Sequence, residues 1–329
     1  MTGEFPIDAE HLRQVLCAGG RAPSKHNTQP WRFQPTRDAI DIWAERTWRL
    51  PASDPDDREL RLACGAALFN IRTALTYFGY APQTELLPDP TQPDLLARVG
   101  VRDGVPGAPP PAVTGLFRAV WRRSTNRKPF RAEDVPAVTR RALRQTAEAE
   151  GARLILVEDP ALRAALRGLV RTAHHHQESN PACRAELAEW TGHPESSGDG
   201  VPRHLAGPRP EPQDEWAMRD FTGGTAESRP PGKDFEPRPT IAVLISTGDY
   251  PVHQVQAGQA LQHVLLTATV AGLACSYLNQ PVEVPTCRRE LRDLLGGTGW
   301  PQVVLRLGFG GPTPPSPRRA LDDIGTLGG

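Results

Sequence analysis

Ala22-Pro-Ser-Lys-His-Asn-Thr-Gln-Pro-Trp31 is the stretch of this sequence that says most about the fold. Between its two prolines lie four side chains that can form hydrogen bonds: Ser24, His26, Asn27 and Gln29. Proline restricts the backbone, so these groups are presented in a defined arrangement with little additional loss of entropy. The residues alone leave two interpretations open. Their polar groups could pair with a heterocyclic ligand, or Ser24 and Asn27 could cap backbone groups in a helix-to-strand turn.

Apolar periodicity on both sides of this loop predicts alternating helices and short strands. In the first part of the chain we expect a helix at 8–19, strands at 31–34 and 40–44, a helix at 60–79 and a strand at 95–101. Further along we expect a helix at 137–149, a strand at 153–157, a helix at 160–172, a strand at 241–246, a helix at 256–271 and a strand at 303–308.

The two longest predicted helices share a pattern that favours a duplicated unit. Gly65-Ala-Ala-Leu68 stands before Gly79, and Gly258-Gln-Ala-Leu261 stands before Gly272, with equal spacing between the glycines. Internal repeats must be judged against chance, because apolar helices that end in glycine also resemble each other by composition. Duplication is the interpretation we favour from this pattern.

A proline-rich segment at 104–112 divides the chain. Proline cannot donate to a sheet and holds the backbone extended, so this segment predicts a linker. We therefore expect a first half at 1–103, a linker at 104–115 and a second half at 116–329.

The second half contains a long stretch, about 173–239, that is rich in glycine, proline and charge. Loops of this length in compact domains are generally lids or disordered segments. Trp190, Trp216 and Phe221 interrupt the stretch and would anchor it. We expect a lid over the functional site.

Composition excludes several classes of function. The chain has 38 Lys and Arg against 38 Asp and Glu, and a net charge of zero argues against a general nucleic-acid or membrane-surface binder. Five cysteines without a Cys-x-x-Cys pair argue against a zinc ribbon or a disulfide framework. The N-terminus does not resemble a signal peptide, and the longest apolar stretch is too short to span a bilayer. We expect a soluble cytoplasmic protein.

Metal and hydrolase chemistry find little support in the sequence. His174, His175 and His176 are consecutive, so on a helix they point in different directions and do not form a tetrahedral site. Ser24 and His26 lie on one short loop, and the Gly-x-Ser-x-Gly pattern of hydrolases is absent. We expect no bound metal.

Two arginine clusters are candidate anion sites. Trp121-Arg-Arg-Ser-Thr-Asn-Arg127 offers several guanidinium groups, which bind phosphate through paired hydrogen bonds. From spacing alone a solvated helix start is the better interpretation in a chain so rich in arginine. Pro317-Arg318-Arg319 near the C-terminus allows the same two interpretations.

Taken together, these segments resemble the nitroreductase-like family of FMN flavoproteins. The matching elements are the Pro-Ser-x-x-Asn-x-Gln-Pro-Trp loop, Arg122-Arg-Ser124, Gly272-Leu-Ala274 and Pro317-Arg-Arg319. The match covers most of the chain except about 173–239. The resemblance implies an α+β fold of two half-repeats, each with a mainly antiparallel sheet and a long central helix.

The order of these motifs departs from the ordinary family pattern. Ordinary members are homodimers in which both subunits contribute to each flavin site, and the Arg-x-Ser element precedes the loop. Here the first half keeps the loop, and the second half keeps the arginines of the Arg122–Arg127 segment and the tail. This arrangement resembles a fused, pseudo-dimeric branch of the family, typified by a mycobacterial dormancy protein. It implies one complete site, one lost site and a monomer.

The resemblance implies that the cofactor is FMN. Its phosphate would lie near Arg122, Arg123, Ser124 and Arg127, with Arg318 or Arg319 reaching in, although the spacing leaves the choice between Asn126 and Arg127 open. Backbone groups near Leu278, Asn279 and Gln280 would approach the N5 edge. The loop would line the ring system with Pro23, Ser24, His26, Asn27, Thr28, Gln29, Pro30 and Trp31.

The implied activity is two-electron transfer through the flavin. NADPH or NADH would deliver hydride to N5, and a nitroaromatic, a quinone or a similar small-molecule acceptor would receive the electrons. The chemistry then belongs to the cofactor, and no catalytic side chain is expected. An FMN-binding or storage protein with a closed lid is the alternative, and a tailoring oxidase reoxidised by oxygen is a third possibility.

Overall fold

The computed structural model describes residues 7–103, 108–225, 229 and 234–325. Its helices are α1 (Ala9–Gly20), α2 (Arg58–Tyr77), α3 (Pro111–Arg122), α4 (Ala137–Ala149), α5 (Pro160–Ser179), α6 (Pro181–Glu189), α7 (Pro251–Val270), α8 (Gln280–Glu283), α9 (Pro285–Leu294) and α10 (Leu321–Ile324). Its strands are β1 (Trp31–Pro35), β2 (Ala39–Ala44), β3 (Tyr80–Leu86), β4 (Leu95–Asp103), β5 (Arg153–Leu156), β6 (Thr191–His193), β7 (Val201–Pro202), β8 (Thr240–Ser246), β9 (Ala274–Tyr277) and β10 (Trp300–Gly308).

Two four-stranded sheets with the same topology form the frame. Their strand orders are β1-β2-β4-β3 and β5-β8-β10-β9, and all neighbouring strands within them are antiparallel. In each half a helix of 20 residues connects the second strand to the third: α2 in the first half and α7 in the second. The expected α+β class with antiparallel sheets is therefore present. The sequence prediction missed β3 and β9, the third strand of each half.

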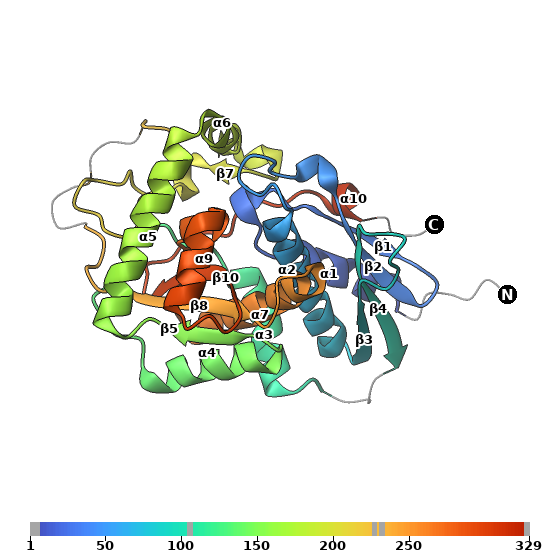
Figure 1. The fold of residues 1–329 in the computed structure, drawn as a ribbon. Helices are drawn as coiled ribbons and strands as arrows, with labels where there is room; N and C mark the ends of the chain where they lie inside the picture. The colour runs from blue at the N-terminus through green and yellow to red at the C-terminus, as the bar shows by residue number, and fades with distance from the viewer. Residues whose placement is uncertain (1–6, 104–107, 226–228, 230–233, 326–329) are drawn as a thin grey trace.

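The long helices α2 and α7 pack together between the two sheets (Figure 1). They cross at two glycines. A Cβ atom on Gly65 would lie 2.0 Å from the carbonyl oxygen of Val255, and one on Gly258 would lie 2.2 Å from that of Leu62. Gly65 and Gly258 are separated by the same number of positions as Leu62 and Val255, so the contact is symmetric. The glycines allow two backbones to meet where any larger residue would separate them.

Two expectations about the linker and the lid need correction. The segment at 108–115 is not extended throughout, because α3 begins at Pro111; residues 104–107 lie outside the described part. Proline suits the first turn of a helix, where its missing N–H has no partner to lose. Likewise, α5 continues through Ser179 and α6 follows, so the first part of the predicted lid is helical.

The segment between β5 and β8 is an insertion into the second half. The first half joins the equivalent strands, β1 and β2, by a short hairpin. Asp159 caps α5 at the start of the insertion, and Trp216 is buried in the apolar cluster that includes Leu166 and Ile241. The insertion is thus anchored to the second sheet, and we refer to residues 158–239 as the insertion.

The C-terminal tail crosses from the second half to the first. After β10 the chain runs to α10, which packs against α1, and Gly325 forms a bridge with Phe33 of β1 (Figure 1). This crossing brings Arg318 and Arg319 to the loop at 22–31.

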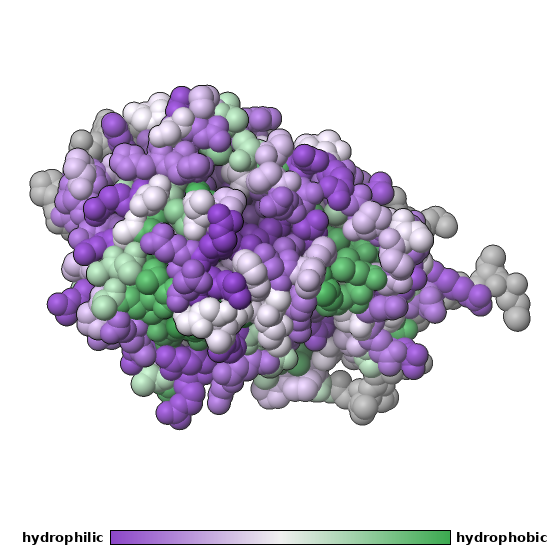
Figure 2. All heavy atoms as spheres, viewed as in Figure 1, coloured by the Kyte–Doolittle hydropathy of each residue, from purple (hydrophilic) through white to green (hydrophobic). Residues whose placement is uncertain are grey.

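The face of the molecule shown in Figure 2 is mostly hydrophilic, with smaller hydrophobic areas. Within the described ranges, the structure contains no helix with the length and apolar character that a bilayer crossing requires.

Candidate functional site

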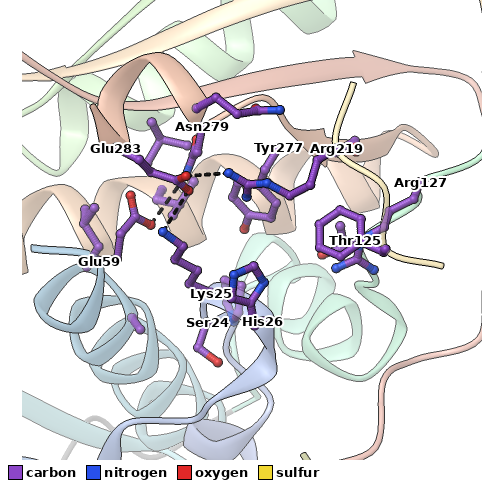
Figure 3. Close-up of a pocket in the computed structure, with 18 residues that line it drawn as sticks. Ser24, Lys25, His26, Glu59, Thr125, Arg127, Arg219, Tyr277, Asn279 and Glu283 are labelled. Carbon is purple, nitrogen blue, oxygen red and sulfur yellow. Dashed lines mark hydrogen bonds and ion pairs between the residues drawn. The ribbon is translucent and has the colours of Figure 1, made fainter. Parts of the chain in front are cut away.

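A cavity lies where the two halves meet, with an open volume of about 760 Å³ (Figure 3). We call it the central cavity. It is lined by the loop before β1, the start of α2, the segment after α3, the insertion and the β9–α8 region. Apolar residues such as Leu62, Leu261 and Val303 form part of the wall, and charged side chains form the rest. Mixed apolar and charged walls of this kind are typical of pockets that bind small molecules and cofactors.

The loop at 22–31 has an unusual backbone. His26, Asn27 and Gln29 have φ values of 51°, 62° and 53°, the left-handed region that side chains other than glycine seldom adopt. Ser24 supports this conformation, since its Oγ accepts a hydrogen bond of 2.9 Å from the backbone N–H of Gln29. Strained residues of this kind persist where the surrounding structure holds them, and they concentrate at functional sites.

A buried carboxylate, Glu283, connects three parts of the chain at the edge of the cavity. Lys25 Nζ of the loop lies 3.2 Å from the Glu283 carboxylate, and Arg219 of the later part of the insertion lies 2.5 Å from it (Figure 3). Gln177 Nε2 of α5, in the first part of the insertion, donates to the same carboxylate at 2.7 Å. Burial opposes ionisation of Glu283, but the charges of Arg219 and Lys25 outweigh it and hold its pKa well below the ordinary value. Glu283 therefore remains charged and fixes the insertion against the loop.

A second buried carboxylate, Glu59, begins the cavity wall on α2. Arg58 forms an ion pair with it, and Asn279 Nδ2 lies 3.4 Å from its Oε2. Burial raises the pKa of Glu59 above the ordinary value. The charge of Arg58 lowers this pKa, and the negative charge of the nearby Glu283 raises it, so the net shift is upward.

His26 lies against the cavity as a neutral imidazole. Burial, together with the charges of Lys25 and Arg219, holds its pKa well below the ordinary value. The ring of Phe221 from the insertion meets the imidazole edge to face, at 6.1 Å between centroids. Phe221 also lies under the guanidinium of Arg127, at 4.4 Å.

Tyr277 contributes a phenol to the cavity wall, and its ring points into the cavity in Figure 3. Within the described part of the chain, its buried hydroxyl oxygen has no hydrogen-bond partner. Burial raises the pKa of Tyr277 far above the ordinary value, so the hydroxyl keeps its proton. It is available to donate to a bound molecule.

Three arginines gather beside the cavity without a carboxylate: Arg21, Arg123 and Arg318. Burial lowers the pKa of each of them, and the positive charge of one neighbour or more lowers those of Arg21 and Arg318 further. None of them forms an ion pair within 4 Å in the described residues, and the buried Nε atoms of Arg21 and Arg123 have no partner there. A cluster of positive charges without a carboxylate, one of them buried and two half-buried, is suited to an anion. We call it the arginine cluster.

Similar proteins place the chain in a family. It is 33% identical to Rv3131 of Mycobacterium tuberculosis, a protein provisionally named an NAD(P)H nitroreductase, over 98% of this chain and 93% of that one. This chain belongs to the nitroreductase-like family of FMN flavoproteins. The expected likeness to the mycobacterial protein Acg is confirmed, at 30% identity over 97% of this chain and 96% of Acg.

The solved structures that resemble this chain are less similar to it than the mycobacterial relatives are. A nitroreductase with bound FMN from Desulfitobacterium hafniense matches 65% of this chain and 98% of its own, at 15% identity and a TM-score of 0.42. A likeness at this level carries no argument, so the family assignment depends on the mycobacterial relatives. No protein-family model matches the chain.

Some of the residues expected from the nitroreductase family line the central cavity. They are Pro23, Ser24, His26, Arg127, Asn279 and Gln280. Leu278 lies behind this wall, buried in the apolar cluster around Trp216. Thr28, Pro30 and Trp31 are buried beneath the loop and do not line the cavity.

Asn27 and Gln29 make contacts that the family motif did not predict. Asn27 Nδ2 donates to the carbonyl oxygens of Gly200 and Pro317, each at 3.1 Å, and Gln29 Nε2 donates to that of Gly198 at 2.8 Å. In this structure their amides hold the insertion and the tail in place. Their assignment to the flavin ring stays a prediction.

The arginine residues expected around the phosphate separate into different environments. Arg122 is exposed at the end of α3, whereas Arg123 is buried in the arginine cluster. Ser124 Oγ donates to the carbonyl oxygen of Thr313 at 3.1 Å. Arg318 donates to Asn27 Oδ1 at 2.9 Å and to backbone carbonyls, and Arg319 pairs with Asp199 at 2.5 Å.

Sequence reasoning missed several residues of the site. Arg21 directly precedes the quoted loop, so its position was a usable signal. Glu59, Arg219, Tyr277 and Glu283 carry no local motif, because they meet only when α2, the insertion, β9 and α8 come together.

Proposed function

We propose that this protein is an FMN-dependent NAD(P)H oxidoreductase of the nitroreductase type. The observation that carries the proposal is the arginine cluster beside the central cavity. A dianionic phosphate would compensate the positive charges of Arg21, Arg123 and Arg318, none of which has a carboxylate partner in the described residues, and would accept from the unpartnered Nε atoms of Arg21 and Arg123. The family membership and the mixed apolar and charged lining of the central cavity support the same interpretation.

The residues present fit such a cofactor. The cluster would hold the phosphate by charge-assisted hydrogen bonds, each contributing about 1.5–3 kcal/mol. The cavity beside it would take the ring system, with Ser24, Tyr277 and Asn279 offering polar groups along its edge. The backbone near Gln280 lines the same wall.

When bound, FMN supplies two-electron chemistry at N5 between NADPH or NADH and a nitroaromatic, quinone or similar acceptor. The side chains orient the ring and exclude water. Glu283 keeps the insertion against the loop, and Phe221 covers part of the cavity. His26 and Tyr277 are neutral at physiological pH and can donate hydrogen bonds without changing the charge of the site.

The test compares two adjacent arginines. Arg123→Gln removes a buried member of the cluster, whereas Arg122→Gln removes an exposed guanidinium and serves as the matched control. We expect Arg123→Gln to weaken FMN binding by about tenfold or more, since one charge-assisted contact is lost. Absorbance of the purified protein and titration with FMN measure the effect. Wild-type protein that stays colourless after soaking in FMN would refute the proposal.

An FMN-storage protein is the second candidate, and a specific contact favours it. Carbonyl oxygens of Gly198 and Gly200 in the insertion bind the loop amides, which closes one side of the site. Anaerobic addition of NADPH or NADH separates the two functions. Prompt bleaching that a nitroaromatic reverses supports the oxidoreductase, and lasting yellow colour supports storage.

We further propose that the chain is a fused pseudo-dimer, with halves at about 1–103 and 116–329, that acts as a cytoplasmic monomer with one FMN. The shared strand order and the symmetric crossing of α2 and α7 support the duplication. Light scattering tests the monomer, because a mass of twice the 35.9 kDa chain would contradict it.

A further inference from the structure

A second chamber lies behind the central cavity, on the insertion side, with an open volume of about 420 Å³. The two spaces share the wall formed by Arg127, Arg219, Phe221 and Tyr277. We call the second space the insertion chamber. The proposed function leaves it unused, because the arginine cluster and the central cavity account for the cofactor.

The walls of the insertion chamber are aromatic and apolar. Trp216, Met218, Phe235 and Pro208 line it from the insertion, and Leu278 lines it from the other side. Rigid, flat walls of this composition suit an aromatic ring, which stacks on or meets other rings favourably.

One cation on the shared wall is not compensated. Arg219 pairs with Glu283, and Arg306, which also lines the chamber, pairs with Glu236 at 3.2 Å. Arg127 forms no ion pair within 4 Å in the described residues. Its Nη1 donates to the carbonyl oxygen of Leu205, and its guanidinium group stacks over the ring of Phe221. Burial, together with the charge of Arg219, lowers its pKa to about 10, so it stays charged at neutral pH.

A buried donor lies on the same wall. The hydroxyl of Tyr277 has no partner among the described residues, although a buried polar group is normally hydrogen-bonded. A cation without a carboxylate and a buried hydroxyl without a hydrogen-bond partner in the described residues therefore lie on the wall that the two spaces share.

We propose that the insertion chamber binds the ring of an aromatic electron acceptor that carries a carboxylate or a similar anionic group. Arg127 binds the anionic group, Tyr277 donates to an oxygen of the same ligand, and Phe221 lies between that ligand and the central cavity. The inference rests on the proposed function where it calls the ligand an electron acceptor. The binding site itself does not depend on that function.

The experiment compares two probes that differ by one carboxylate group, 4-nitrobenzoate and nitrobenzene, by calorimetric titration of the oxidised protein as purified. We expect 4-nitrobenzoate to bind about tenfold more tightly, the value of one charge-assisted contact. Arg127→Gln should remove this preference, and Arg127→Lys should keep most of it. The lysine variant therefore distinguishes the loss of positive charge from misfolding. Arg209→Gln, at an exposed arginine beside the chamber residue Pro208, is the matched control and should change nothing.

The hydroxyl is tested separately. Tyr277→Phe should weaken both probes several-fold, whereas Tyr250→Phe, at a residue that is 74% exposed, should weaken neither. Equal binding of the two probes, or a preference that survives in Arg127→Gln, would overturn the inference.

The two proposals fail differently. A protein without FMN that still prefers 4-nitrobenzoate through Arg127 keeps the chamber and loses the oxidoreductase. A yellow protein that NADPH reduces, but that shows no preference, does the reverse.

Discussion

The two ends of the α2–α7 helix pair have the same topology, but different side chains surround them. At one end Ala63 of α2 lines the central cavity. The equivalent residue of α7 is Gln256, and its side chain occupies the space beside Gly151, where a Cβ atom would lie 2.3 Å from Gln256 Nε2. One end of the pair is open, and the other is filled.

The filled end carries its own polar network. Arg72 donates to Glu150 at 2.8 Å and to Gln259 at 2.6 Å, and His263 Nδ1 lies 3.4 Å from Glu150. The ten-residue loop Arg21–Pro30 of the open end is replaced here by a tight turn at Gly151 (φ 74°). Two halves with the same strand order are therefore packed differently at the two ends of the helix pair, and the central cavity lies at one of them.

The largest effect is expected at the symmetric crossing itself. Gly65→Ala and Gly258→Ala should each destabilise the protein by about 4 kcal/mol, because the new Cβ meets backbone that cannot move aside. Denaturant unfolding measures this. Gly168→Ala, at a helical glycine with nothing within 4 Å of the added Cβ, is the control and should stabilise by about 0.5–1 kcal/mol. Equal effects at the two kinds of site would show that the helices do not cross as described.

The next largest effect concerns the charged contacts of the open end. Glu283→Gln leaves Lys25 and Arg219 buried without their carboxylate, so we expect a loss of about 3 kcal/mol in the free energy of unfolding. Glu158→Gln removes a carboxylate that is exposed beside two arginines and should cost about 0–1 kcal/mol. A tolerated Glu283→Gln would mean that the insertion is held in place by other contacts.

Exchange of the equivalent residues tests the difference between the ends directly. Ala63→Gln should fill the central cavity and weaken FMN binding by about ten- to a hundredfold. Gln256→Ala should leave the stoichiometry at one FMN per chain, because the filled end lacks the loop and the arginine cluster. Absorbance titration gives both values. A second bound FMN in Gln256→Ala would show that the side chain alone closes the other site.

The smallest effect is a pH dependence at the filled end. Burial opposes ionisation of Glu150, but its contacts with His263 and Arg72 outweigh it and lower its pKa below the ordinary value of 4.5. A lowered pKa contributes stability that is present above pH 4.5 and is lost as the pH falls through the folded-state value. The stability difference between wild type and Glu150→Gln should therefore shrink in acid, as thermal unfolding at several pH values would measure. A constant difference would argue against this ionisation.

The sequence predicted the long helices and most strands of the two sheets better than the site. Both long helices and their glycines were legible because apolar periodicity and local residue types specify them. The strands β3 and β9 were missed, since each follows its long helix after a short turn and has little alternation of its own. The quoted loop was recognisable as a site element because its residues are contiguous.

The rest of the site depends on contacts between distant segments. Arg123 rather than Arg122 is buried, and spacing alone could not distinguish two adjacent arginines. Tyr277 and Glu283 became informative only when the fold showed one hydroxyl without a partner and one carboxylate shared by three segments. Long-range assembly of this kind leaves no local pattern.

The crossing of the C-terminal tail has a consequence for how the protein is made. Arg318 donates to the carbonyl oxygen of Gly20, 298 positions earlier in the chain. Translation is slow relative to local folding, so the first half emerges and waits for its final contacts. This contact cannot form before Arg318 has been synthesised and has left the ribosome. A nascent chain that stops before Arg318 would have the loop without the contacts that the tail makes to it.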